Sequence, residues 1–548
     1  MQRTALTLAA LLSTAATPAL ADTLIDNAKG VQVDASGKLQ RFTGLLIGDD
    51  GKVVRLLAEG EARPNATTRI DAGYRALLPG LVDAHGHVMG LGTAALQLDL
   101  TGTKSIAELQ QRLREYAAAN PGKGWIRGRG WNQELWSDAR FPTAADLDAA
   151  VDNRPVWLER VDGHASVGNS AALKAAGITA ATKAPSGGRI ENGLFVDAAT
   201  ALVDRKIPGA STADRDAALA KAQELLLSVG VTAAADMGTT VDDWRTMQRA
   251  GQRGALKVRV MSYASDLDAL ASAAGKKPTA WLHDGHLRMA GIKIYADGAL
   301  GSRGAWLKAP YHDMPNTRGL SLIQDAQLRD RAGKAAAGGF QVAIHAIGDA
   351  ANQQVITAFE GMSARYTGDR RWRIEHAQVL DPKDLPRLAK SGIIASMQPT
   401  HQTSDRTMAE ARLGPQRLDG AYAWQTIART GARLAFGSDF PVEAPNPFPG
   451  LAAAISRQDP SGQPAGGWRP QDKVSVEQAL SGFTRDAAYA GFAEDKFGAL
   501  EPGRYADFIL VDRDITTAAP TNVAAAKVLE TWVGGKKVWA SAGATPAR

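Results

Sequence analysis

The sequence predicts an α/β protein, a (β/α)8 barrel of the TIM type with a small β-sandwich domain formed from both ends of the chain. Between residues 80 and 490, eight short runs rich in Val, Ile and Ala alternate with longer segments of helical period. Runs of this kind are typical of parallel strands buried on both faces. The chain ends carry hairpin signals instead, and a long segment separates the first run from the second.

The barrel is expected to use eight strands. They span 81–87, 231–238, 256–263, 291–298, 341–348, 372–378, 393–399 and 433–439. The first two lie about 140 residues apart, far more than one βα unit needs. We therefore interpret roughly 100–205 as an insertion between strands one and two, with a helix and a strand of its own, that lies over the barrel mouth.

The two chain ends predict the second domain. The pairs Asp50-Gly51 and Gly534-Gly535 each separate two apolar runs, as hairpin turns do. Residues 22–79 and 491–548 are therefore expected to form one small β-domain, and residues 80–490 the barrel.

The first residues predict a targeting segment. Arg3 precedes a short apolar run, 5–16, and the small residues of 19–21 form a cleavage site. The run is too short to cross a membrane, and no later apolar stretch in the sequence reaches that length. We expect residues 1–21 to be a signal peptide, and the mature protein to be exported, to the periplasm in a cell with two membranes.

Composition excludes several classes of function. The 548 residues include no cysteine, which excludes disulfides, thiolate metal ligands and a cysteine nucleophile. A transition metal would therefore need nitrogen and oxygen ligands. The net charge is +6, but the basic residues are scattered and form no block that could follow phosphates. The expected partner is a small-molecule substrate, with no nucleic acid and no membrane span.

The ends of the expected strands carry a group of candidate metal ligands. The first strand ends in "DAHGH", where His85 and His87 stand two residues apart and should face the same side. Later strands contribute Lys293, His345, His376 and Asp439. Active sites of such barrels lie at the carboxyl ends of the strands. A single strand histidine is more often structural, but six such residues at one level predict a metal site.

Lys293 needs a separate explanation, because it stands between Ile292 and Ile294 in an apolar strand. Burial disfavours a charged amine and lowers its pKa. A neutral amine can add carbon dioxide, and the resulting carbamate can bridge two cations. The alternative is an ordinary ion pair between Lys293 and a nearby carboxylate such as Asp297.

The chain resembles a known family in several motifs. "LLPGLVDAHGHV", "HAIGD", "RIEHAQ" and "GSDFPVE" are similar to motifs of the amidohydrolase superfamily of metal-dependent hydrolases. "RGRGWNQELW", "GIKIYADGALGSRGAWL" and "GALEPGRYADFILVD" resemble its amidohydrolase-3 branch, which includes N-substituted formamide deformylases. The resemblance extends from about Leu77 to Asp512.

This resemblance implies a role for each candidate ligand. The two histidines of the first strand would bind one Zn²⁺, His345 and His376 would bind a second, and the carbamate of Lys293 would bridge them. Asp439 would contact the first metal and transfer the proton. The implied reaction is hydrolysis of a non-peptide amide or N-acyl carbon–nitrogen bond by a metal-activated hydroxide. The superfamily also has members with one metal, and the resemblance allows a homodimer.

Four further residues are candidates for substrate binding. His164 lies in the expected insertion, Arg303 follows the fourth strand, His401 follows the seventh, and Trp131 is placed to line the pocket. Each also has a structural explanation: a surface or capping role for a histidine, an ion pair for the arginine, or a place in the core for the tryptophan.

Two other functions fit the same sequence. The site could hydrolyse a cyclic amide, a carbamate or an ester. A secreted binding protein could use the barrel without catalysis, although the presence of every expected ligand argues against it. A deaminase fits less well, because Lys293 favours a bridged pair of metals.

Overall fold

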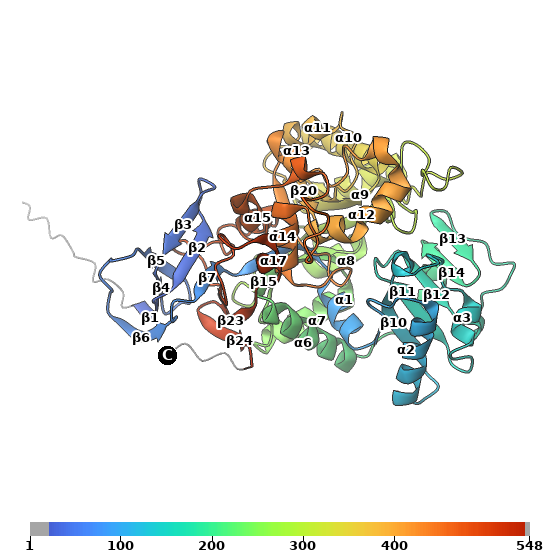
Figure 1. Cartoon of the computed structure of the whole chain (residues 1–548), viewed down its shortest axis with the longest axis horizontal. Coiled ribbons are helices and arrows are strands. Elements are labelled where there is room, and N and C mark those ends of the chain that lie inside the picture. The colour runs from blue at the N-terminus through green and yellow to red at the C-terminus, as the bar shows by residue number, and fades with distance from the viewer. Residues whose placement is uncertain (1–20, 543–548) are drawn as a thin grey trace, which may run out of the picture.

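A nearly closed barrel of eight parallel strands lies at the centre of the computed structural model, which describes residues 21–542 (Figure 1). The order around the barrel is β8 (Leu81–Gly86), β15 (Val231–Thr239), β16 (Arg259–Ala264), β17 (Leu287–Tyr295), β18 (Gln341–Ala346), β19 (Arg373–His376), β20 (Ile394–Met397) and β21 (Leu434–Phe436). A parallel bridge between Gly86 and Phe440 joins the first strand to the last. The prediction of an α/β barrel is confirmed, although β17 begins earlier than expected.

Helices cover the outer face of the barrel. They include α6 (Thr212–Ser228), α7 (Val241–Gln252), α8 (Leu267–Ala274), α9 (Asp325–Ala337), α10 (Asp349–Arg365), α11 (Leu385–Lys390) and α13 (Trp424–Arg429). On α10, Val355, Phe359 and Met362 recur at helical spacing and are buried. With their counterparts on the other helices and the strands they form the largest hydrophobic core.

The amino-terminal end of the barrel is filled by apolar packing. Helix α16 (Arg485–Ala490) contributes Ala487 and Ala488 to a second core that includes Val82 and Ala233, which come early in their strands. Because this end is packed, the carboxyl ends of the strands are left for a functional site.

Between β8 and β15 the chain forms a separate six-stranded sheet. Its order is β13 (Gly188–Glu191), β14 (Leu194–Asp197), β12 (Ala165–Gly168), β11 (Val156–Arg160), β10 (Ile126–Trp131) and β9 (Leu98–Asp99). Helix α2 (Ile106–Ala119) packs on it through Leu109 and Leu113. The segment expected to hold one strand thus holds a sheet with its own core.

Two further sheets contain the ends of the described chain. One joins β1 (Ala21–Asp26), β4 (Gly44–Ile47), β5 (Val53–Leu57) and β6 (Ala66–Asp71), and the other joins β2 (Lys29–Val33), β3 (Leu39–Phe42), β7 (Ala76–Pro79), β22 (Phe508–Val511), β23 (Val528–Val533) and β24 (Lys536–Ala540). Both sheets contribute to one core, where Leu45 packs with Phe508 and Trp532. We retain 22–79 and 491–548 as the proposed bounds of one β-domain.

Glycines occupy the tight turns of these sheets, where the backbone needs a positive φ. Gly534 and Gly535 connect β23 to β24 with φ of 56° and 70°, and Gly51 lies between β4 and β5 with φ of 74°. Positive φ at both central residues is the geometry of a tight hairpin turn. In Figure 1 these sheets lie on one side of the barrel and the sheet between β8 and β15 lies on the other.

The expected targeting segment stays a prediction. Its residues 1–20 lie outside the described part of the chain, so the structure does not test export. Among residues 21–542, no helix is long and apolar enough to cross a membrane.

Candidate metal centre

His85, in the first barrel strand, and His87, which directly follows that strand, meet a carboxylate that follows the last strand. Asp439 Oδ1 lies 3.1 Å from His87 Nε2 and 3.4 Å from His85 Nε2. Backbone hydrogen bonds hold the two segments together: Asp439 N–H donates to the His85 carbonyl at 2.7 Å, and His87 N–H donates to the Phe440 carbonyl at 2.8 Å. The closure of the barrel therefore also assembles this part of the site.

Three residues from the middle strands complete the cluster. Lys293 Nζ on β17 lies 3.3 Å from His85 Nε2. The centre of the His376 ring lies 4.7 Å from that of His85 and 4.6 Å from that of His345. One ligand atom each from His85, His376 and Asp439 lie within 4.8 Å of one another. The six residues expected at the strand ends thus converge.

Burial sets the charge of the cluster. The side chains of His85 and Lys293 are 0–1% exposed. Burial lowers the pKa of His85 to about 4, and it lowers the pKa of His345 and His376 well below the ordinary value. These imidazoles are therefore neutral at pH 7 and keep a lone pair for a metal. Burial also lowers the pKa of Lys293 to about 8.

Asp439 stays ionised in the same surroundings. Burial alone would raise its pKa, but the histidines around it, His85 first, hold the pKa of this carboxyl well below its usual range. The centre therefore combines neutral imidazoles with an anionic carboxylate.

Sequence reasoning missed the residues that orient His85. Glu375 Oε2 lies 2.6 Å from His85 Nδ1, and Arg373 Nε donates to the other oxygen of the same carboxylate at 2.7 Å. Despite complete burial, this arginine holds the pKa of Glu375 below its ordinary range. An ionised acceptor at Nδ1 favours the tautomer that leaves Nε2 free for a metal. The signal in the sequence was a pair of opposite charges, Arg373 and Glu375, at alternate positions of an expected barrel strand.

His345 has a similar partner in Asp297. Asp297 Oδ1 lies 3.4 Å from His345 Nε2, and its carboxylate accepts hydrogen bonds from the backbone N–H groups of Trp306, Ile347 and Gly348. Within residues 21–542, no carboxylate lies at ion-pair distance from Lys293. Lys293 and Asp297 therefore do not form an ion pair in the structure.

Two cavities open from this cluster. The first has a volume of about 890 Å³, and the second, of about 720 Å³, follows α12 (Pro399–Leu413) and the loop after Asp439. Arg129, Asp162 and His164 line both. The sheet between β8 and β15 therefore supplies a wall common to the two cavities.

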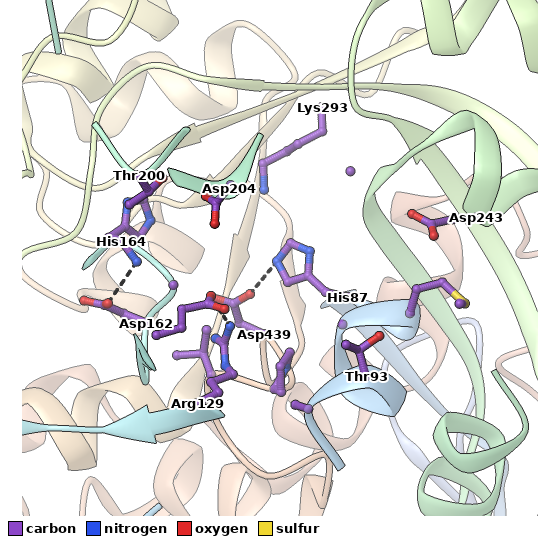
Figure 2. Close-up of a pocket in the computed structure, with 18 of the residues that line it drawn as sticks. His87, Thr93, Arg129, Asp162, His164, Thr200, Asp204, Asp243, Lys293 and Asp439 are labelled. Atoms are coloured by element: carbon purple, nitrogen blue, oxygen red, sulfur yellow. Dashed lines mark hydrogen bonds and ion pairs between the residues drawn. The ribbon is translucent and has the colours of Figure 1, made fainter. Parts of the chain in front are cut away.

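The first cavity is drawn in Figure 2. His87, Lys293 and Asp439 point toward its centre, and Asp162 and His164 lie at its side. His164 Nδ1 lies 2.6 Å from Asp197 Oδ1. Burial alone would lower the pKa of His164, but the hydrogen bond and charge of Asp197 raise it to about 9. A protonated imidazole therefore faces the cavity at neutral pH.

His401 reaches the second cavity. Its side chain is buried on α12, and its Nε2 lies 3.9 Å from Asp439 Oδ2. Within the described chain, this nitrogen has no hydrogen-bond partner.

Two other candidates do not reach the cavities. Trp131 is fully buried in the core of the six-stranded sheet, and its Nε1 donates to the Leu158 carbonyl at 2.9 Å. Arg303 pairs with Asp313 at 2.9 Å and is absent from the lining of both cavities. Trp131 is therefore a core residue of the six-stranded sheet, and Arg303 is part of an ion pair; both are the structural alternatives given above.

The cluster fits a divalent metal. His85 Nε2 and His87 Nε2 converge on one carboxylate oxygen of Asp439, and all the candidate donors are nitrogen or oxygen atoms. Imidazole and carboxylate are the ligands that zinc and related metals take in sites without cysteine. The buried carboxylates beside His85 and His345 are the partners that metal-binding histidines usually have.

Comparisons with known proteins place this chain among amidohydrolases. A family model described as "Amidohydrolase family" matches residues 68–539. Protein LONG AFTER FAR-RED 3 of Arabidopsis thaliana is 34% identical over 87% of this chain and 84% of its own. N-substituted formamide deformylase of Arthrobacter pascens is 27% identical over 94% of this chain and 97% of its own.

A solved structure is similar as well. The crystal structure of an uncharacterised metal-dependent hydrolase from Pyrococcus horikoshii OT3 has a TM-score of 0.74 and 27% identity, and it covers 91% of this chain and 99% of that one. The barrel, the converging ligands and a family match over most of the length lead to one conclusion: this chain belongs to the amidohydrolase family and is a metal-dependent hydrolase.

Proposed function

We propose that this enzyme hydrolyses a carbon–nitrogen bond in a non-peptide amide or an N-acyl amine. The observation that carries the proposal is the convergence of four histidines, Lys293 and Asp439 at the floor of two cavities. The likeness to the formamide deformylase of Arthrobacter pascens over 94% of the chain supports the type of bond.

The proposed centre holds two Zn²⁺ ions. His85 and His87 would hold one, and His345 and His376 the other. A pKa of about 8 leaves part of Lys293 as the neutral amine. That amine would add carbon dioxide with release of a proton, and its carbamate oxygens would join the two sites. The bound metals would supply a lowered pKa for the attacking water and polarisation of the substrate carbonyl.

The protein's own groups would move the proton. Asp439 is held ionised, so it can accept the proton of the attacking water and then donate it to the departing nitrogen. Protonation matters because an unprotonated amide nitrogen is a poor leaving group. The charged His164 would hold the substrate carbonyl by a hydrogen bond, and Glu375 would keep His85 in its metal-binding tautomer.

The test is a substrate panel with one catalytic variant. Formamides, N-acyl amines, N-acyl amino acids and esters are assayed with the zinc-loaded enzyme and with Asp439→Asn. We expect cleavage of at least one amide class, and a fall of about a hundredfold or more in kcat/KM for the variant. Asp330→Asn, the same change on an exposed position of α9, is the control.

Two results would count against the proposal. Cleavage of esters without any amide would show that the bond type is wrong. Full activity of Asp439→Asn, with unchanged zinc content and melting temperature, would place the proton transfer on another residue.

A further inference from the structure

Two carboxyl groups of the second cavity have no lysine or arginine as an ion-pair partner in the described chain. Asp405 on α12 and Glu443 in the loop after β21 both line it. Asp405 Oδ2 accepts hydrogen bonds from Tyr422 OH at 2.9 Å and Gln378 Nε2 at 3.2 Å. Glu443 Oε1 accepts one from Ser404 Oγ at 2.6 Å. All three donors are neutral, and within residues 21–542 no lysine or arginine lies at ion-pair distance from either carboxylate.

The cationic side chains of the same wall are already engaged. Arg160 is paired with Asp162, and its other nitrogens donate to the amide oxygens of Gln133 and Asn132. Arg129 is paired with Glu159 and donates to a backbone carbonyl. Neither guanidinium forms an ion pair with Asp405 or Glu443, because each is held by another carboxylate. Burial raises the pKa of both Asp405 and Glu443, and the charge of His401 only partly opposes this rise.

A buried histidine at the same cavity also has a ring nitrogen without a hydrogen-bond partner in the described chain. His401 is 8% exposed, and it stands one helical turn before Asp405 on α12. Its Nε2 has no hydrogen-bond partner within the described chain and lies 3.9 Å from Asp439 Oδ2. Buried polar atoms are normally satisfied, so this nitrogen is a second indication that a polar ligand occupies the space between Asp405 and the metal centre.

The spacing of its side chains argues against a metal site in the second cavity itself. Among described residues, the ligand atoms of His85, His376 and Asp439 form the only group of three that comes within 4.8 Å, and His401, Asp405 and Glu443 do not form one. Apolar side chains, including Leu91, Leu135 and Met408, also line the cavity. Separated carboxylates in an apolar wall suit a charged organic group on a hydrocarbon body.

We infer that the second cavity binds a positively charged substituent of the substrate, an ammonium or guanidinium group on an apolar spacer. Asp405 and Glu443 receive its charge, and His401 lies between that group and the bond that is cleaved. The inference rests on the proposed function, because it assumes that the bond is cleaved at the adjacent metal centre. It narrows the substrate class to cationic N-acyl compounds.

The kinetic test compares two matched substrates. Both substrates are N-acyl amines with an apolar spacer of the same length. In one the spacer ends in an ammonium group, and in the other it ends in a hydroxyl group. We expect kcat/KM to be at least tenfold higher for the ammonium substrate. Asp405→Asn and Glu443→Gln, which keep the hydrogen bonds from Tyr422 and Ser404, should each lower the ratio of the two values about tenfold. Glu59→Gln, an equal change of charge at an exposed residue outside both cavities, should keep the wild-type ratio.

A binding test separates this inference from the proposed function. Calorimetry measures 2-phenylethylammonium and 2-phenylethanol against the zinc-loaded enzyme and the Asp405→Asn, Glu443→Gln double variant. The subsite would be supported if the wild type bound the ammonium probe more tightly than the alcohol and the double variant lost this preference. This would hold even if no amide were cleaved. Equal binding of both probes, or amide cleavage with no preference for the ammonium substrate, would overturn the subsite and leave the hydrolase intact.

Discussion

At the residue scale, backbone conformation sets the direction in which the candidate metal ligands point. In a regular strand, Glu375 and His376 would face opposite sides, yet Glu375 contacts His85 and the His376 ring lies beside it. His376 has φ of 74°, and Asp439 has φ of 60°, conformations that non-glycine residues seldom adopt. Alternation along a strand was enough to predict that His85 and His87 act together. Applied to β19, alternation places either Glu375 or His376 in the site, and both reach it only because the backbone turns at His376.

The substrate-binding candidates show a related limit. The role of an arginine or tryptophan depends on partners distant in the sequence, such as Asp313 for Arg303 and Leu158 for Trp131. Motif position alone placed these two residues near the pocket. His164 reaches the cavity because its loop connects β11 to β12, two strands of the sheet that lines the cavity.

The charge of His164 gives a prediction about pH. Its pKa in the folded protein is about 9, above the ordinary value of 6.5. The stabilisation by Asp197 is therefore fully present below pH 6.5 and is lost as pH rises through 9. We expect the melting temperature of the wild type to fall more between pH 6.5 and 9.5 than that of His164→Gln.

The control is His312→Gln, an exposed histidine outside both cavities, which should keep the wild-type pH dependence. Parallel curves for wild type and His164→Gln would show that the charged pair with Asp197 does not form.

At the element scale, the barrel strands were predictable, whereas most strands of the insertion were not. The barrel strands are parallel and buried on both faces, so most of them are largely apolar runs between helices. Strands such as β12 (Ala165–Gly168) are four residues long and contain small or polar residues, "ASVG". They are defined by antiparallel pairing with β11 and β14, which no local pattern specifies.

The meeting of the first and last barrel strands gives a second prediction. A Cβ atom on Gly86 would lie 2.3 Å from the Phe440 ring, which is buried. Gly86→Ala should therefore force the two segments apart and lower the free energy of unfolding by about 1–3 kcal/mol. Because His85, His87 and Asp439 flank this contact, zinc affinity should fall as well. Chemical denaturation and zinc titration measure the two effects.

The matched control is Gly361→Ala on an exposed position of α10, where a Cβ atom meets nothing within 4 Å. That change should stabilise the helix by about 0.5–1 kcal/mol. Unchanged stability and zinc affinity in Gly86→Ala would mean that Phe440 moves aside freely and that the closure does not position the ligands.

At the scale of the whole molecule, one buried ion pair ties the barrel to the sheets of the chain ends. Arg259 on β16 donates to Asp507 through Nε at 2.7 Å and through a terminal nitrogen at 2.9 Å. Asp507 directly precedes β22 and also accepts from Gly534 N–H, in the turn between β23 and β24. The Arg259 guanidinium lies 3.8 Å from the centre of the Tyr505 ring. The pair joins residues 248 positions apart, so sequence patterns gave no indication of it.

Removing one partner of this pair should be costly. Asp507→Ala leaves Arg259 charged in a site where both side chains are 1–2% exposed, and loss of one partner of a buried pair costs about 3–5 kcal/mol. We expect the free energy of unfolding to fall by that amount, while Asp330→Ala, which removes an exposed partner of Lys334, should change it little. In Arg259→Leu, Asp507→Ala the loss should be smaller than in Asp507→Ala, because no unpaired charge stays buried. An equal or larger loss in the double variant would mean that Arg259 stabilises the junction mainly by its packing on Tyr505.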